Sequence, residues 1–321
     1  MKRATFVFVI CLLALAAGCG SAPLPPAERV SPALVEIAPA QTEPLQEGKA
    51  PAQTEPVPAQ ETPAPSDTSA PEPEGAWYKT RNEELKAVLL RAHPDLSQEQ
   101  IERNIQRMKI DPSKPMVALT FDDGPRPGVT DKILDVLEEY NARATFFVCG
   151  WHTEREENRD IILRAASLGC EIGNHTWSHR TLVGQNLVSV RYELENTNKA
   201  VQDITGIKPR CFRPPGGVYT FEATAIARDS DMLVVLWSQS GNVHEYDPEK
   251  IAQNVQKQIV DGEELQNGDI VLLHDTPHCM VDAVKIIVPM LQEQGYQLVT
   301  VWELLNCGNQ QLTPGERYDR R

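Results

Sequence analysis

Short apolar runs alternate with amphipathic segments through most of the chain. The apolar runs have the length of strands, and between them apolar residues recur at helical spacing. The predicted strands are Val117–Phe121, Thr145–Val148, Glu171–Asn174, one at Cys211–Arg213, Leu233–Trp237, Ile270–Leu273 and Gln297–Val301. The predicted helices are Asp131–Tyr140, Ile161–Leu168, Leu187–Ile204, Phe221–Arg228, Ile251–Ile259 and Val281–Gln292. Repeated βα units form a parallel sheet, open or closed, and about seven of them favour a barrel, although eight are usual.

A helical segment, here called the lead-in, precedes this alternation at residues 76–114. Its apolar residues fall at helical spacing, and Ser97 with Gln100 forms a capping box. The two prolines of Asp111–Pro115 cannot continue a helix, so we expect the lead-in to end there.

The N-terminal residues predict export. Lys2 and Arg3 are positively charged, and the apolar run Phe6–Ala17 is shorter than the about 18 residues that a spanning helix needs. Ala16–Cys19 resembles the lipobox of bacterial lipoproteins, in which the cysteine is acylated, although Ala16 stands where that motif prefers leucine. We expect Cys19 to anchor an exported protein to the extracytoplasmic face of the cell membrane, with an ordinary signal peptidase site as the alternative.

Residues 19–75 have the composition of a disordered linker. They hold more than half of the chain's 25 prolines and no aromatic residue, and Ala38–Pro44 is repeated at Ala50–Pro56. Such a segment cannot bury enough apolar surface to fold, so we interpret it as a passive spacer. Part of the net charge of −14 belongs to this linker. The sequence has no stripe of basic residues, so it does not predict a nucleic-acid partner. The predicted organisation is a signal peptide at 1–18, the linker at 19–75, the lead-in at 76–114, the main domain at 115–306 and a polar C-terminal tail at 307–321.

Five cysteines remain outside the signal peptide and the predicted anchor: Cys149, Cys170, Cys211, Cys279 and Cys307. An odd number cannot all pair within one chain, and none has the CxxC spacing of a zinc site. Buried thiols and one or two disulfide bridges both remain open.

Polar residues follow several predicted strands at the point where the apolar run ends. They are Asp122 and Asp123, His175–His179, Arg213–Gly217, Ser238 and His274. The carboxyl ends of the strands form the active face of a βα barrel, so these separate segments are expected to share a catalytic site. Adjacent side chains on a strand point to opposite sides, so Asp122 and Asp123 are expected to have different roles. The alternative for this pair alone is a solvated Asp-Gly turn.

His175 and His179 lie four residues apart, a spacing that on one helical turn would aim both imidazoles at a common point. Such a pair alone is often structural, because histidines also serve as satisfied polar residues. With an aspartate it becomes a set of two nitrogens and one oxygen, which in catalytic zinc sites leaves a coordination position open for water.

Four motifs, in order, resemble those of the polysaccharide deacetylase domain, also called the NodB homology domain or carbohydrate esterase family 4. They are Thr120–Asp123, His175–His179, Arg213–Gly217 and Leu272–His274. The resemblance covers about three fifths of the chain and implies a distorted (β/α) barrel with fewer than eight regular units. It also implies a hydrolase that removes acetyl groups from polysaccharides.

The resemblance implies a role for each motif residue. Asp123, His175 and His179 would hold a divalent metal, with zinc as the expected ion. Asp122 would be the general base, and His274 would protonate the leaving amine.

The remaining motif residues would support that chemistry. Arg213 would orient Asp122 and keep it ionised, and the N–H of Gly216 would stabilise the oxyanion. Gly216 stands where the family often has an aromatic residue. The acetyl pocket would be formed by Trp237, Leu272 and Pro215, although Trp237 and Leu272 could equally be core residues.

One motif departs from the family. After the strand that ends at Trp237 the family commonly has an Asp-Trp pair whose aspartate supports the catalytic histidine, whereas this chain has no aspartate before Asp247. We expect Glu245 and Tyr246 to take the place of this pair, with Glu245 reaching His274. The alternatives are the adjacent Asp275 as the partner of His274 and the absence of any such support.

The predicted function is deacetylation of N-acetylglucosamine or N-acetylmuramic acid residues in peptidoglycan, near which a lipid anchor and a linker would hold the enzyme. Chitooligosaccharide, xylan and exopolysaccharide are the alternative substrates. From another class, the alternative is a wall-binding lipoprotein that has lost turnover through its altered motif.

Overall fold

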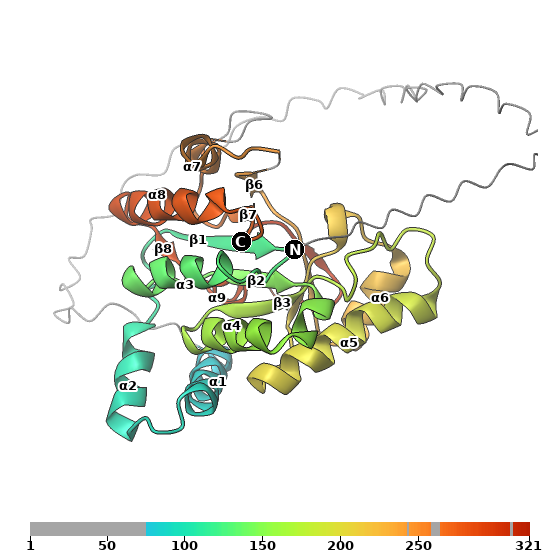
Figure 1. The fold of residues 1–321 in the computed structure, drawn as a ribbon, viewed down its shortest axis with the longest axis horizontal. Coiled ribbons are helices and arrows are strands. Elements are labelled where there is room, and N and C mark those ends of the chain that lie inside the picture. The colour runs from blue at the N-terminus through green and yellow to red at the C-terminus, as the bar shows by residue number, and fades with distance from the viewer. Residues whose placement is uncertain (1–74, 243, 258–263, 309–310) are drawn as a thin grey trace, which may run out of the picture. The chain divides into compact units, whose positions relative to one another are not determined.

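The computed structural model describes residues 75–321 except 243, 258–263 and 309–310 (Figure 1). The signal peptide, the lipid anchor at Cys19 and nearly all of the linker lie outside the described residues, so they stay predictions. In the part that is described, no helix combines the length and the apolar character needed to cross a membrane.

The described strands form one parallel sheet that curls within a layer of helices (Figure 1). The strand order is β6-β7-β1-β2-β3-β4-β5-β9, and β8 pairs with the start of β1. The strands are β1 Met116–Asp122, β2 Thr145–Val148, β3 Glu171–Asn174, β4 Cys211–Phe212, β5 Leu233–Val235, β6 Gln239–Ser240, β7 Ile270–His274, β8 Gln297–Leu298 and β9 Arg317–Tyr318. The predicted fold class, a distorted (β/α) barrel, is confirmed.

Helices alternate with the strands along the chain. They are α1 Ala76–Ala92, α2 Gln98–Arg107, α3 Thr130–Glu139, α4 Glu156–Ser167, α5 Leu187–Thr205, α6 Phe221–Asp229, α7 Pro248–Gln256, α8 Cys279–Glu293 and α9 Val301–Asn306. Two short 3₁₀ helices, η1 Gly150–Glu154 and η2 Pro215–Gly217, follow β2 and β4. The predicted capping box is present at the start of α2, where Ser97 and Gln100 each accept from the other's backbone N–H.

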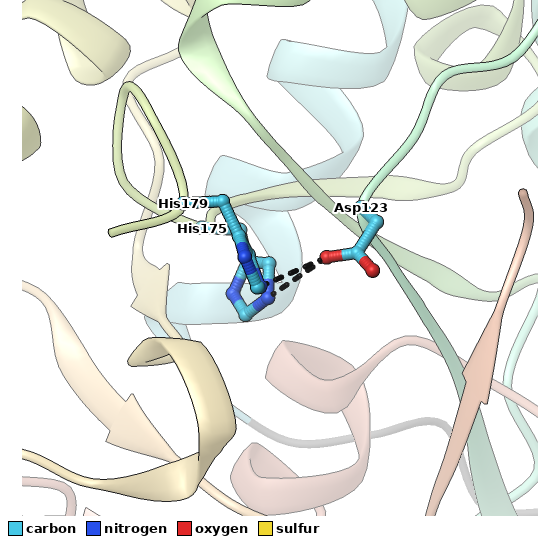
Figure 2. A group of neighbouring side chains, drawn as sticks. All are labelled: Asp123, His175 and His179. Atoms are coloured by element: carbon cyan, nitrogen blue, oxygen red, sulfur yellow. Dashed lines mark ion pairs between the residues drawn. The ribbon is translucent and has the colours of Figure 1, made fainter. Parts of the chain in front are cut away.

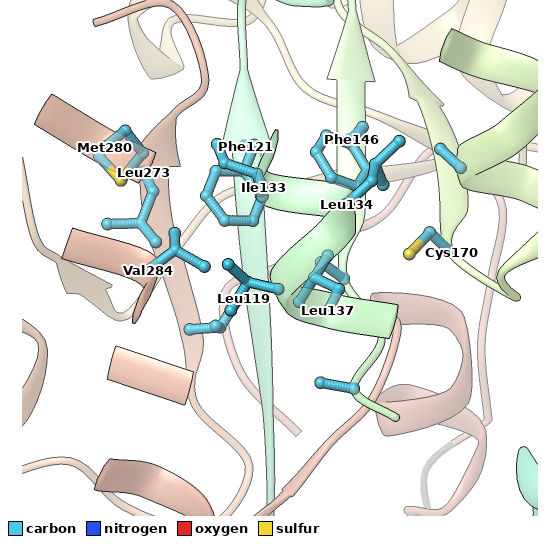
Figure 3. Close-up of a cluster of buried hydrophobic side chains, with 14 of the residues drawn as sticks. Leu119, Phe121, Ile133, Leu134, Leu137, Phe146, Cys170, Leu273, Met280 and Val284 are labelled. Carbon is cyan, nitrogen blue, oxygen red and sulfur yellow. The ribbon is translucent and has the colours of Figure 1, made fainter. Parts of the chain in front are cut away.

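The largest core cluster among the described residues joins the sheet to several helices, and Figure 3 shows the part of it against α3 and α8. Leu119 and Phe121 of β1 pack there with Leu134 of α3 and Val284 of α8. Every residue of β1 is buried, as expected for a central strand covered on both faces. The end of β1 therefore holds Asp122 and Asp123 on a rigid base.

Buried ion pairs connect the lead-in to the barrel. Arg81 of α1 lies 2.6 Å from Glu303 of α9, and Arg143, just before β2, lies 3.0 Å from the same carboxylate. Burial alone would raise the pKa of Glu303, but Arg143 and Arg81 hold it below its usual value. All three side chains are buried, so α1 is part of the folded unit.

The C-terminal segment differs from the prediction. The expected strand Gln297–Val301 stops at Leu298, and Thr300 caps α9 in a capping box with Glu303. The predicted polar tail contains β9, which pairs in parallel with β5. Two-residue strands carry no periodic signal, so tertiary pairing alone defines β9.

Candidate active site

The turn after β1 separates the two acids. Asp122 is the last residue of the strand and is buried, whereas Asp123 adopts a left-handed backbone with φ 77° and is half-buried. Gly124 follows, and a Cβ there would lie only 2.1 Å from Oδ2 of Asp275. A side chain at this position would collide with the buried carboxylate of Asp275, so glycine allows the turn to pack against that carboxylate.

Asp122 faces Arg213, which follows β4. The Nη1 group of Arg213 donates to Oδ1 of Asp122 at 2.8 Å and to the hydroxyl of Thr120 at 2.6 Å. The guanidinium is fully buried and lies over the ring of Phe147, with 4.2 Å from Cζ to the ring centroid. Arg213 therefore holds one oxygen of Asp122 and leaves Oδ2 directed toward His175, 3.7 Å from its Nε2.

His175 and His179 lie in a loop after β3 and not on the helical turn that their spacing suggested. Thr176 and His179 have φ values of 67° and 56°, which lie in the left-handed region and exclude a right-handed helix. The loop is held by Glu193 of α5, which accepts from the backbone N–H of Ser178 at 2.7 Å and from its hydroxyl at 2.6 Å. A tight loop thus brings the imidazoles together, with ring centroids 4.9 Å apart.

Asp123, His175 and His179 converge on one point (Figure 2). Oδ1 of Asp123 lies 3.4 Å from Nε2 of His175 and 3.1 Å from Nε2 of His179. Nδ1 of His175 donates to the carbonyl of Arg213 at 2.7 Å, which leaves the lone pair of Nε2 in the neutral ring for the shared point.

The donor set fits a divalent cation. One potential ligand atom from each of the three residues lies within 4.8 Å of the others, and Oδ1 of Asp123 is buried without a hydrogen-bond partner. Burial would raise the pKa of Asp123, yet the neighbouring histidines hold it below its usual value. His175 is buried, Asp123 is half-buried and His179 is exposed, so the shared point opens to solvent on one side. Lone pairs that face one another favour a cation between them, and two imidazoles with one carboxylate are typical zinc ligands.

His274 ends β7 and contacts Asn242, in the stretch that departs from the family motif. Its Nδ1 lies 3.0 Å from Oδ1 of the buried Asn242. An amide oxygen only accepts, so Nδ1 carries the proton and Nε2 is left for chemistry in the cavity. The partner of His274 is therefore a neutral amide.

Both carboxylates that we expected to support His274 have other partners, so that prediction is wrong. Glu245 accepts from the backbone N–H groups of Tyr246 and Asp247, each at 2.9 Å, and so stabilises its own turn. Asp275 is buried and accepts from the hydroxyl of Thr130 at 2.6 Å. Burial raises the pKa of Asp275 to about 7.

A cavity of about 630 Å³ joins these groups. Of the predicted site residues, eight line it: Asp122, Asp123, His175, His179, Gly216, Trp237, Leu272 and His274. Arg213 is buried behind Asp122. Pro215 is buried and is not a lining residue of this cavity, so its place in the acetyl pocket stays a prediction. Because Pro214 and Pro215 have no N–H, Gly216 carries the first backbone donor after Arg213.

Tyr246, expected with Glu245 in place of the Asp-Trp pair, also lines the cavity. Five lining residues were missed from the sequence: Arg126, Asn242, His244, Thr276 and Pro277. Asn242 lies in the departing motif, where only carboxylates were considered as partners. Arg126 lies three residues after Asp123, a proximity that could have drawn attention to it. The cysteine question is settled by geometry, because all five cysteines among the described residues are free thiols.

Comparison with known proteins places the chain in a family. A family model described as polysaccharide deacetylase matches residues 109–235. The peptidoglycan-N-acetylmuramic acid deacetylase PdaC of Bacillus subtilis is 36% identical over 197 residues, 61% of this chain and 40% of that protein. A peptidoglycan-N-acetylglucosamine deacetylase of Bacillus cereus is 35% identical over 196 residues, 59% of this chain and 88% of that protein.

A solved structure agrees with the sequence comparisons. A family 4 acetyl xylan esterase from Clostridium thermocellum, in complex with a cobalt ion, has a TM-score of 0.57 and 32% identity, covering 64% of this chain and 98% of that one. The chain belongs to the polysaccharide deacetylase family. It spans about two fifths of the length of the Bacillus subtilis relative.

Proposed function

We propose that this protein is a metal-dependent deacetylase that hydrolyses the acetamide of N-acetylated sugars in peptidoglycan and releases acetate. One observation carries the proposal: three groups of residues lie at one cavity. They are the candidate metal ligands Asp123, His175 and His179, the buried ion pair of Asp122 with Arg213, and His274. These are the parts that amide hydrolysis requires, namely a cation site, a base and an acid.

The chain's own residues account for the proton transfers. Bound at Asp123, His175 and His179, a divalent cation would supply Lewis-acid activation. Oδ2 of Asp122 accepts a proton from the attacking water as the new C–O bond forms, while Arg213 keeps Oδ1 in place. Protonated His274 donates from Nε2 to the amine nitrogen as the C–N bond breaks, and Asn242 orients the ring.

The cavity walls fit a small acyl group. Leu272 is buried and Trp237 is half-buried, and both line the cavity with Gly216. The ring of Trp237 is held against the backbone of Gly217, where a Cβ would lie 2.9 Å from the ring. We assign the acetyl methyl to this wall and the oxyanion to the N–H of Gly216.

We propose peptidoglycan as the substrate for two reasons. The relatives from two Bacillus species are named for muramic acid and glucosamine residues of that polymer. The sequence also predicts export and acylation at Cys19, which would hold the enzyme at the membrane beside the wall. Acetylated xylan, chitooligosaccharide and exopolysaccharide are the alternatives, and the solved xylan esterase makes the first of them worth testing.

The test is acetate release by the full-length, zinc-loaded protein from peptidoglycan, chitin oligomers, a bacterial exopolysaccharide and acetylated xylan. The Asp122→Asn variant is the control, because it should fold and keep the triad. We expect release from peptidoglycan that the variant lacks. Release from another polymer alone would overturn the substrate, and no release from any of them would favour a wall-binding lipoprotein without turnover.

A further inference from the structure

Arg126 lies on the wall of the active-site cavity. Its Nη1 group donates to the carbonyl of Thr276, and its Nη2 group lies 3.2 Å from Nε2 of His278. Both contacts reach the loop between β7 and α8, directly after His274. Across the part of the chain that the structure describes, no Asp or Glu carboxylate forms an ion pair with Arg126, unlike Arg164, which pairs with Asp135 and Glu138.

The backbone of Arg126 is fixed as well. Its N–H donates to the hydroxyl of Thr130 at 2.8 Å, and its carbonyl accepts from the N–H groups of Val129 and Thr130 at 3.1 and 2.9 Å. Thr130 in turn donates to the buried Asp275. The start of α3 thus holds the residue, and the β7–α8 loop holds its head group.

The guanidinium of Arg126 has donors to spare. Arginine carries five N–H donors and no acceptor, so His278 must accept at Nε2 and carry its own proton on Nδ1. These two contacts use two of the five donors. An exposed, positioned guanidinium with free donors matches a carboxylate, which it can bind through two parallel hydrogen bonds.

We propose that Arg126 binds a carboxylate carried by the muramic acid unit of the substrate. This proposal rests on the proposed function. Muramic acid, a sugar of peptidoglycan, bears an acidic substituent at C3, beside the acetamide at C2, whereas chitin has no such substituent. Arg126 and Asp123 line the same cavity, so a substrate that occupies the cavity can contact both residues. The carboxylate is that of the lactyl group or that of the attached peptide.

The experiment compares three substrates of equal length: glycan strands stripped of peptide, strands with peptide, and neutral chitin oligomers. The full-length, zinc-loaded wild type is assayed beside Arg126→Gln and Arg103→Gln, the second of which removes an exposed arginine from α2. We expect Arg126→Gln to lower the ratio of kcat/KM for muramic strands to that for chitin by about tenfold or more, through KM. Arg103→Gln should leave the ratio unchanged.

The substrate arms locate the carboxylate. A fall with peptide-free strands assigns it to the lactyl group, and a fall confined to peptide-bearing strands assigns it to the peptide. Added salt should lower the wild-type ratio and leave that of Arg126→Gln nearly constant. An unchanged ratio in Arg126→Gln, or an equal loss on all three substrates, would overturn the proposal.

A binding measurement separates this proposal from the proposed function. If no substrate releases acetate, peptide-free and peptide-bearing strands are titrated against the same metal-loaded proteins at equilibrium. Tighter binding of either strand to wild type than to Arg126→Gln supports the carboxylate site even though deacetylation has failed. Equal binding of both strands to the two proteins overturns it.

Discussion

Replacing Asn242 with aspartate should extend the activity of this protein to higher pH. Oδ1 of Asn242 lies 3.0 Å from Nδ1 of His274, so the substitution puts a carboxylate where a neutral amide now stands. The size and shape of the side chain hardly change. A negative charge at this distance stabilises the imidazolium, which is the form that donates the proton.

The magnitude follows from the geometry. Two unit charges about 4 Å apart attract by about 4 kcal/mol at an effective dielectric constant of about 20. Asn242 is buried, so desolvation of the new carboxylate offsets much of this attraction. A net gain of about 1.4 kcal/mol moves the alkaline limb of the pH–kcat profile upward by about one pH unit.

The assay is kcat as a function of pH for wild type, Asn242→Asp and Asn242→Ala on one N-acetylated oligomer. Asn242→Ala removes the orienting contact without adding charge, so it should lower kcat without moving the alkaline limb upward. Refutation would be an unchanged profile and rate in Asn242→Asp, because His274 would then not be the proton donor that limits turnover.

Four further predictions follow from the site and the fold. Asp122→Asn should keep its metal and lose about 10²-fold or more in turnover, whereas Asp123→Ala should lose the metal, as elemental analysis would measure. Arg81→Ala should lower the free energy of unfolding by about 3 kcal/mol in denaturant, because it breaks a buried ion pair. Cys19→Ser should move the protein from the membrane fraction to the soluble exported fraction. The pKa of Asp275 is raised from 3.8 to about 7, so the folded protein keeps a proton there that the unfolded chain loses. The free energy of unfolding of chelator-treated protein should therefore fall as the pH rises from about 4 to about 7, and Asp275→Asn should remove this pH dependence.

Controls make these outcomes decisive. Arg103→Ala, which breaks an exposed pair on α2, should cost no more than about 1 kcal/mol, and a similar cost for Arg81→Ala would contradict the role of the buried pair. Equal metal loss in the two aspartate variants would show that their roles are not separate. A Cys19→Ser protein that still pellets with membranes after a salt wash would argue against acylation. The same pH dependence of stability in Asp275→Asn would assign it to another group.

Much of the fold could be predicted from local sequence patterns. The buried run of β1 and the helical spacing of α3 and α8 reflect which faces of each element lie against the core, and those faces recur at fixed intervals along the chain. The strand-end positions of Asp122, Asp123 and His274 follow from the same pattern, because parallel strands end on a common face.

The contacts that decide the chemistry depend on the tertiary structure. Asn242 contacts His274, and Arg126 contacts the loop after β7, which lies more than a hundred residues further along the chain. No periodicity in the sequence encodes either contact. The loop of His175 and His179 was misjudged as a helical turn because spacing alone does not distinguish a helix from a tight loop. The short strand β9 exists through its pairing with β5, which only the folded sheet supplies. The sequence therefore determines the long elements whose buried faces recur at regular intervals, whereas short strands such as β9 and the partners of side chains at strand ends are set by distant segments that only folding brings together.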